Sequence, residues 1–295
     1  MARHPGFLAY LSFASVSFFW GTTYLGIRVG LESLPPLVLV ASRFLLSGSV
    51  LLIALLVARI PIPRGRDLWI NVLLGLLVLG CGNTCLTYSE QYIPSSLAAL
   101  IVTLSPVVLV TMESLLPGGE KLTAGTLVGL SVAICGAAVL VGPDVWTQGL
   151  SGNVVKGFLI LQLGSIAWNS GSLWQRRLPA KVHPFASAAI HQLAAGVAFA
   201  PFALLETKPA IWDLKAIGAI VYLATFGSII GYTSYIVTLR TLPVAIVSLY
   251  NYINPVVAAI LGWLVYREPF GRRELLAMAI IFAGVAIVKR YGHRD

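Results

Sequence analysis

The chain has 295 residues, of which 58% are hydrophobic and only 11% are charged. Soluble globular proteins carry about 25% charged residues, so this composition excludes a soluble enzyme, a nucleic-acid-binding module and a disordered chain. The net charge of +9 is the excess of 20 Lys and Arg residues over 11 Asp and Glu residues. The basic residues do not gather in one polar segment, and we therefore expect no nucleic-acid partner.

Apolar runs of roughly the length that crosses a bilayer recur along the chain. In chain order they are Leu8–Val29, Leu37–Ala58, Leu68–Tyr88, Ser95–Leu116, Ala124–Val141, Val154–Gln175, Pro184–Leu205, Lys215–Leu239, Val244–Tyr266 and Glu274–Lys289. The first run continues for a full span without a small-residue cleavage site, so we interpret it as a membrane helix and not a removed signal. The sequence predicts an all-α membrane protein with ten transmembrane helices and the lipid bilayer as a partner.

The Lys and Arg residues outside the spans predict the orientation. With the amino terminus inside, 12 of them fall on the cytoplasmic side and 7 on the other. Because cytoplasmic loops carry the excess of these residues, both termini are expected in the cytoplasm. The predicted location is a bacterial-type cytoplasmic (inner) membrane.

The two halves of the chain resemble each other at a nearly constant separation. Matches at 148 or 149 residues pair Phe19-Trp20-Gly21 with Ala167-Trp168-Asn169, Ser105-Pro106-Val107-Val108 with Asn254-Pro255-Val256-Val257, and Gly136-Ala137-Ala138-Val139 with Gly284-Val285-Ala286-Ile287. We predict a first five-helix repeat over residues 1–143 and a second over 150–295. Five is odd, so the second repeat enters the membrane from the opposite side, as in transporters built from inverted repeats.

Several motifs, some of them shared by the two repeats, carry a resemblance to a known family. They are Trp20-Gly21-Thr22-Thr23-Tyr24, Arg43-Phe44, the run from Ala98 through Pro106 to Gly119-Glu120, and in the second half Pro255, Glu268-Pro269 and Gly284. The chain resembles the EamA branch of the drug/metabolite transporter superfamily, twice, although Asn169 stands where the first half has Gly21. The resemblance implies ten helices around a central cavity, and activities that include export of amino acids, aromatic ones among them, and of cationic drugs.

Aromatic residues near mid-span predict a wall of that cavity. Trp20 and Tyr24 share one face of the first helix, and Trp168 lies at the equivalent depth of the sixth. Belts of Trp and Tyr lie at the membrane interface, whereas Trp20 and Trp168 are expected near the middle of the bilayer. Plain packing is the alternative. An aromatic wall suits flat substrates, or cations held by the ring face.

Polar side chains inside the spans are the next candidates. They are Asn83 and Tyr88 in the third helix, Tyr235 in the eighth, and Tyr250 and Asn251 in the ninth. Lipid cannot satisfy such groups, so they face the bundle interior or water. We predict that they line the cavity with the aromatic residues; hydrogen bonding between helices is the alternative.

Two prolines occupy equivalent mid-span positions. Pro106 in the fourth helix and Pro255 in the ninth each remove a backbone hydrogen bond, which predicts a pair of hinges flanking the cavity. A static kink is the alternative.

Arg43 lies about seven residues into the second helix, where ionisable groups are costly. We favour structural anchoring, and a clamp for a substrate carboxylate is the sharper alternative. Its repeat partner His191 is interpreted as a packed histidine, with titration as the alternative. Glu113 is the one carboxylate near a deep position, which weakens the case for strong proton coupling.

No ATP-binding loop, zinc motif or nucleophile elbow occurs in the sequence, so no cofactor, metal site or catalytic residue is expected. We predict a transporter and not an enzyme: an exporter of small organic metabolites by alternating access, aromatic or other neutral amino acids first. A multidrug exporter of aromatic cations is the alternative. A membrane-embedded enzyme or a scaffold is the competing class. Protons are a candidate driving ion, and the oligomeric state stays open.

Overall fold

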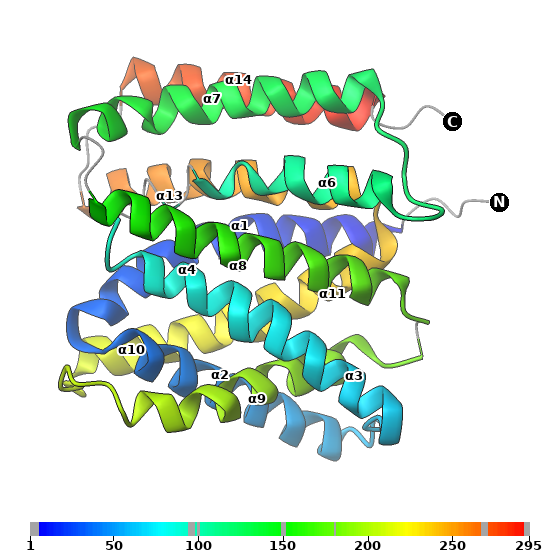
Figure 1. Cartoon of the computed structure of the whole chain (residues 1–295), viewed down its shortest axis with the longest axis vertical. Helices are drawn as coiled ribbons and strands as arrows, with labels where there is room; N and C mark the ends of the chain where they lie inside the picture. Colours follow the sequence, from blue (N-terminus) through cyan, green and yellow to red (C-terminus); the bar gives the residue numbers. More distant parts are fainter. Residues whose placement is uncertain are drawn as a thin grey trace.

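The computed structural model describes residues 6–93, 98, 101–148, 152–179, 181–266 and 271–291, and the elements formed by these residues are all helical. In chain order they are α1 (Phe7–Ser33), α2 (Pro36–Val57), α3 (Gly65–Gly75), η1 (Leu76–Asn83), α4 (Thr84–Ser89), α6 (Ser105–Leu115), α7 (Ala124–Gln148), α8 (Gly152–Arg177), α9 (Pro184–Ala203), α10 (Leu214–Tyr222), η2 (Leu223–Tyr232), α11 (Thr233–Thr241), α12 (Val244–Val247), α13 (Tyr250–Tyr266) and α14 (Arg272–Tyr291) (Figure 1).

Two long rods each contain a π-helical middle. The first rod runs through α3, η1 and α4, and the second through α10, η2 and α11. Their π segments begin at Leu76 and Leu223, 147 residues apart, which is close to the spacing of the sequence repeat. The shared irregularity shows that the resemblance between the halves extends to backbone conformation.

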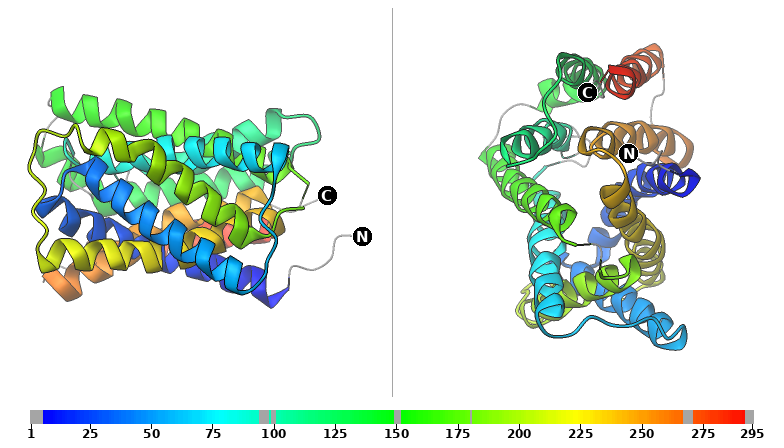
Figure 2. Two further views of the ribbon diagram at one scale, coloured as in Figure 1. Left: turned by 90° about the horizontal axis from the view of Figure 1, so that it is seen from below. Right: turned by 90° about the vertical axis from the view of Figure 1, so that its right-hand side faces the viewer.

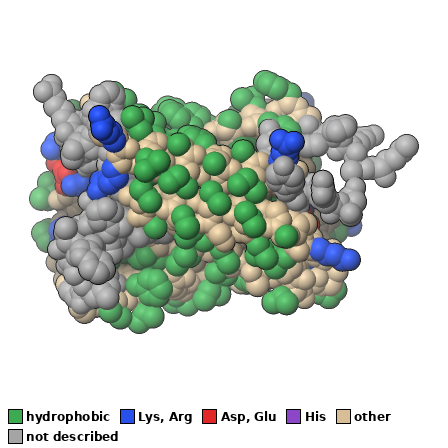
Figure 3. Space-filling view, turned by 90° about the horizontal axis from the view of Figure 1, so that it is seen from above, with side chains coloured by type: hydrophobic (Ala, Val, Ile, Leu, Met, Phe, Trp, Pro, Cys, Tyr) green, Lys and Arg blue, Asp and Glu red, His purple; other side chains and the backbone are tan. Residues whose placement is uncertain are grey.

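Among the described residues, four helical stretches are long and apolar enough to cross a membrane by length and composition: Pro36–Val57, Gly65–Ser89, Pro184–Ala203 and Leu214–Thr241. Shorter apolar helices accompany them. Helices α1 and α8 have the length, 27 and 26 residues, but carry several buried polar side chains. Figure 3 shows hydrophobic side chains over the middle of one face and Lys and Arg toward its two ends, a distribution that suits a bilayer.

The halves pack on each other through equivalent helices. Helix α2 lies along α9, and α7 lies along α14, at opposite edges of the molecule (Figure 1 and Figure 2). Helix α1 packs on the α10–η2–α11 rod, and α8 packs on the α3–η1–α4 rod. A two-repeat architecture accounts for this exchange of partners.

The first helices of the two halves run in opposite directions. The carboxyl end of α1 meets the start of α10, where Ser33 Oγ donates to Asp213 Oδ2 at 3.0 Å. The carboxyl end of α8 meets the other end of that rod, where Arg176 Nη1 donates to Leu239 O at 2.8 Å. The start of α1 and the end of α14 lie at one end of the molecule (Figure 1).

The helix breaks fall ahead of the two prolines and not at them. The chain turns at residues 103–104, and Pro106 is the second residue of α6, where a missing N–H costs no intrahelical bond. Pro255 lies inside α13, after a break at residues 248–249. Asn169 braces the first break, because its Nδ2 donates to Ser105 O at 3.4 Å. The hinge role of both prolines stays a prediction.

Some predicted features lie outside the described residues. They are the beginning of the fourth span, Glu268-Pro269 with the flanking Arg267 and Phe270, and the repeat boundaries at residues 1, 150 and 295.

Candidate functional site

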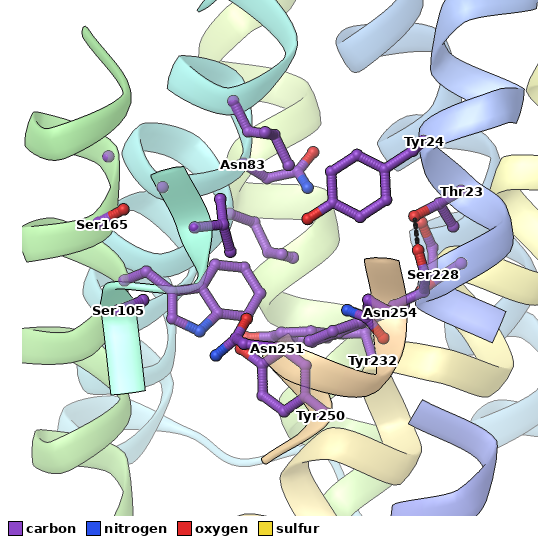
Figure 4. Close-up of a pocket in the computed structure, with 18 of the residues that line it drawn as sticks. Thr23, Tyr24, Asn83, Ser105, Ser165, Ser228, Tyr232, Tyr250, Asn251 and Asn254 are labelled. Carbon is purple, nitrogen blue, oxygen red and sulfur yellow. Dashed lines mark hydrogen bonds between the residues drawn. The ribbon is translucent and has the colours of Figure 1, made fainter. Parts of the chain in front are cut away.

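A pocket lies between the two halves (Figure 4). Its empty volume is about 730 Å³, which includes the part open to solvent. Helices of both halves line it, through Trp20, Thr23, Tyr24, Arg43, Phe44, Leu79, Gly82, Asn83, Leu86, Val102, Ser105, Leu161, Gly164, Ser165, Trp168, Gly227, Ser228, Tyr232, Tyr250, Asn251 and Asn254.

Aromatic rings form one wall of the pocket. Trp20 and Trp168 meet edge to face, with ring centroids 5.4 Å apart. Tyr235 lies 5.1 Å from Trp20 and 5.4 Å from Trp168, and Tyr250 lies 5.1 Å from Trp20. Trp20 Nε1 donates to Gly227 O at 2.9 Å. Packing and this hydrogen bond fix the wall in place.

Glycines in the π segments leave space for the side chains of Trp20 and Trp168. A Cβ on Gly231 would lie 2.6 Å from Trp20 Nε1, and one on Gly82 would lie 3.1 Å from Trp168 Cβ. Each Trp thus packs on the π segment of the other half. π-Helical turns are frequent at functional sites, and here they bring the backbone close to the rings.

Polar groups face the rings across the pocket. Tyr24 and Asn83 point toward one another, from α1 and from the end of η1 (Figure 4). Asn83 Oδ1 is buried and has no hydrogen-bond partner within the described part of the chain. Asn251 Nδ2 donates to Ser248 O at 3.3 Å. A ligand in the pocket therefore meets amide and hydroxyl groups as well as rings.

Arg43 also lies at the pocket, with 5% of its surface exposed. Its Nε donates to Ser228 Oγ at 2.7 Å, and its guanidinium carbon lies 5.1 Å from the Phe44 ring centroid. Within the described ranges no Asp or Glu forms an ion pair with it. The described lining residues include no other side chain with a permanent charge.

His191 is a packed, hydrogen-bonded histidine, in line with the favoured interpretation of the sequence. Its Nδ1 lies 2.8 Å from Tyr232 OH and its Nε2 lies 3.2 Å from Asn71 Oδ1. Asn71 Nδ2 donates to Asp67 O at 2.7 Å, which fixes the amide orientation. We therefore assign the proton to Nε2, so that Nδ1 accepts from Tyr232, a pocket residue.

An ion-pair cluster ties the helix ends together away from the pocket. Arg176 Nη2 contacts Glu120 Oε1 at 2.5 Å, and Arg177 Nη2 contacts Glu113 Oε1 at 3.1 Å. Glu120 also accepts from Val244 N at 3.1 Å. The end of α8 is thus joined to the α6–α7 and α11–α12 connections.

The structure brings together most of the residues predicted from the sequence. Trp20, Tyr24, Asn83, Trp168, Tyr250 and Asn251 line the pocket. Tyr235 lies behind the wall, where its hydroxyl donates to Ser172 Oγ at 2.6 Å. Tyr88 packs against Tyr92 instead, with ring centroids 6.2 Å apart. That the predicted residues contact the substrate stays a prediction.

Other lining residues give a weaker signal in the sequence. Ser105, Ser165 and Ser228 are small hydroxyl residues within apolar stretches and show no periodic pattern, whereas Thr23 follows Trp20 by three positions and so shares its face of the first helix. Tyr232 and Asn254 belong to visibly polar stretches of the eighth and ninth predicted spans and could have been selected. No group of three or more His, Cys, Asp or Glu residues able to hold a metal occurs among the residues with a described placement.

Comparison with known proteins identifies the class of molecule to which this fold and pocket belong. Residues 7–142 and 155–290 each match the EamA-like transporter family. The chain belongs to this family and is a transporter of the drug/metabolite transporter superfamily.

Individual relatives agree with this assignment. The chain is 37% identical over 272 residues, 91% of its length and 86% of the relative's, to the "Uncharacterized inner membrane transporter YedA" of Escherichia coli strain K12. It is 26% identical over 292 residues, covering 92% of this chain and 90% of the relative, to a "Probable terminal-alkyne amino-acid exporter" of Streptantibioticus cattleyicolor. A crystal structure at 22% identity shares the fold, with a TM-score of 0.82 over 97% of this chain and 99% of that chain.

Proposed function

We propose that this chain exports neutral amino acids, aromatic ones first, across the cytoplasmic membrane by alternating access around the central pocket. In this proposal ten helices cross the membrane as two inverted repeats, with both termini in the cytoplasm. The observation that carries the proposal is the pocket between the halves, which combines an aromatic wall with amide and hydroxyl groups. The amino-acid exporter among the relatives supports it.

The position of the wall supports alternating access. Trp20 and Trp168 are repeat counterparts, and their contact lies where the halves meet. A rocking motion of one half against the other would change this contact and the pocket beside it. The ion pairs of Arg176 and Arg177 lie at one end of the bundle, so they would have to separate if that end opens.

A flux measurement tests the proposal. The purified protein is reconstituted into proteoliposomes that are loaded with unlabelled tryptophan, phenylalanine or leucine. Exchange for the same labelled amino acid outside is then followed with and without an imposed proton gradient. We expect saturable exchange above that of empty liposomes, strongest for the aromatic amino acids. A response to the gradient would indicate proton coupling, and its absence would indicate facilitation.

A matched pair of variants separates pocket from surface. Trp168→Ala removes a lining ring, whereas Trp174→Ala removes a ring that is 41% exposed on the same helix. The first is expected to lose exchange and the second to keep it. No exchange of any of the three amino acids by the wild type would contradict the amino-acid proposal and favour another metabolite or a cationic drug.

A further inference from the structure

We propose that Arg43 binds the carboxylate of the transported molecule, so that the central pocket selects organic acids and zwitterions over amines that lack a carboxylate. This inference rests on the proposed transport function and deepens it, because it names the group by which the substrate is recognised.

Arg43 is a buried cation without an ion-pair partner among the described residues. It is 5% exposed, and a guanidinium stays protonated under all ordinary conditions. A buried charge is costly unless it is paired. None of the ion pairs formed by described residues involves Arg43, so the pocket lacks the counter-ion that a substrate could bring.

Arg43 differs from the arginines that hold helix ends together. Arg176 bonds two backbone carbonyls and Glu120, Arg177 bonds Pro117 O and Glu113, and Arg240 bonds Val182 O and Ser187 Oγ. The side chain of Arg43 makes one hydrogen bond within the described chain, from Nε to Ser228 Oγ. Its terminal N–H groups therefore remain for a ligand, which a purely anchoring residue would not leave.

The guanidinium of Arg43 is held in place. Ser228 fixes Nε, and the ring of Phe44 lies beside the guanidinium carbon. A Cβ on Gly227 would lie 2.7 Å from Arg43 Nη2, so the glycine is what allows this close approach to η2. A planar guanidinium fixed through Nε presents the parallel donors that match a carboxylate.

The charge of the pocket points the same way. None of its described lining residues is Asp or Glu, so an amine alone would meet Arg43 with no compensating anion. The ammonium of an amino acid has acceptors to use, including the unpartnered Oδ1 of Asn83. Aromatic cations, the alternative cargo, are therefore disfavoured by the same residue.

The test is ligand-induced thermal stabilisation of the purified full-length protein, which does not depend on flux. The probes share an indole ring: tryptophan, indole-3-propionate, which lacks the amine, and tryptamine, which lacks the carboxylate. We expect the first two to raise the unfolding temperature of the wild type and tryptamine to leave it unchanged. In Arg43→Gln the affinity for indole-3-propionate should fall about 10- to 100-fold, as expected for a lost charged hydrogen-bond pair.

Further variants keep the test decisive if Arg43→Gln does not fold. Arg43→Lys keeps the charge without the planar donors, and Ser228→Ala frees Nε; each should weaken indole-3-propionate more than fivefold. Arg66→Gln, outside the pocket, should match the wild type. Equal stabilisation of the wild type by tryptamine and indole-3-propionate, or stabilisation by neither, overturns the inference. Binding of indole-3-propionate through Arg43 without any amino-acid exchange supports the inference while refuting amino-acid export.

Discussion

The indole rings of Trp20 and Trp168 meet edge to face with centroids 5.4 Å apart and an interplanar angle of 78°. The two residues are counterparts in the sequence repeat, 148 positions apart. Each packs on the π segment of the opposite half, so their contact places a rigid aromatic surface where the halves meet.

This contact predicts graded effects of substitutions at Trp168. An aromatic pair contributes about 0.5–1.5 kcal/mol beyond the area that it buries. Trp168→Phe keeps a ring beside Trp20, so it should weaken tryptophan binding only modestly. Trp168→Ala removes both the ring pair and the wall, and should weaken binding at least tenfold. Competition in the exchange assay measures both; equal affinities for Phe and Ala variants would show that the ring pair does not shape the site.

The glycines of η2 predict a steric effect that can be measured without a substrate. Gly231→Ala would place a Cβ 2.6 Å from Trp20 Nε1. The indole would have to move, and we expect a loss of about 1–3 kcal/mol in stability, the usual cost of overpacking. Gly218→Ala in α10 is the control, because nothing lies within 4 Å of its added Cβ. Thermal unfolding compares the two, and identical behaviour would contradict the close packing of Trp20 on η2.

The His191 network predicts coupling between three residues. His191→Phe would leave the Tyr232 hydroxyl and the Asn71 amide oxygen without their buried partner. Each unsatisfied group costs about 1–3 kcal/mol. Adding Tyr232→Phe removes one orphaned group and should restore part of the lost stability. A double-mutant cycle on unfolding midpoints measures this, and strict additivity would argue against the hydrogen bond.

The ion pair of Glu113 and Arg177 predicts an asymmetric cycle. The Glu113 side chain is 6% exposed, whereas that of Arg177 is 33% exposed. Removing Arg177 leaves a buried carboxylate, so Arg177→Ala should destabilise the protein more than the double variant with Glu113→Gln does. Thermal stability of the four proteins decides; a double variant that is less stable than Arg177→Ala would refute the argument.

A pH dependence is predicted at the start of α10. Asp213 accepts from Ala216 N at 2.7 Å, and this hydrogen bond, aided by Ser33 and Lys215, holds the pKa of its carboxyl below the ordinary value of 3.8. A carboxyl pKa that is lower in the folded state than in the unfolded state stabilises the fold at pH values above the unfolded-state pKa. This stabilisation is lost as the pH falls through the folded-state pKa. Asp213→Asn should therefore lose stability at neutral pH and converge with the wild type in acid. Parallel unfolding curves at all pH values would contradict this.

The sequence was a sufficient guide to the helical architecture and to much of the pocket. Long apolar runs leave few alternatives to helices, and Trp20, Trp168 and Tyr250 stand out because large polar-tipped rings are unexpected deep in a span. Their separation by the repeat length also predicted that Trp20 and Trp168 play equivalent parts.

Other features depend on tertiary contacts that no pattern encodes. The π segments change the helical phase after Leu76 and Leu223, so a regular 3.6-residue projection does not predict which side chains after them face the pocket. The break before Pro106 depends on a brace from Asn169, which is far away in the sequence. The lack of an ion pair at Arg43 among the described residues is likewise visible only in three dimensions.

The central claim is that the pocket beside Trp20 and Trp168 is the substrate site. Equilibrium binding of radiolabelled tryptophan to the purified protein in detergent tests it most directly, with Trp168→Ala and the outward-facing Trp174→Ala measured alongside. We predict saturable binding to the wild type and to Trp174→Ala, and at least tenfold weaker binding to Trp168→Ala. Saturable binding that is unchanged in Trp168→Ala would place the substrate elsewhere and contradict the account.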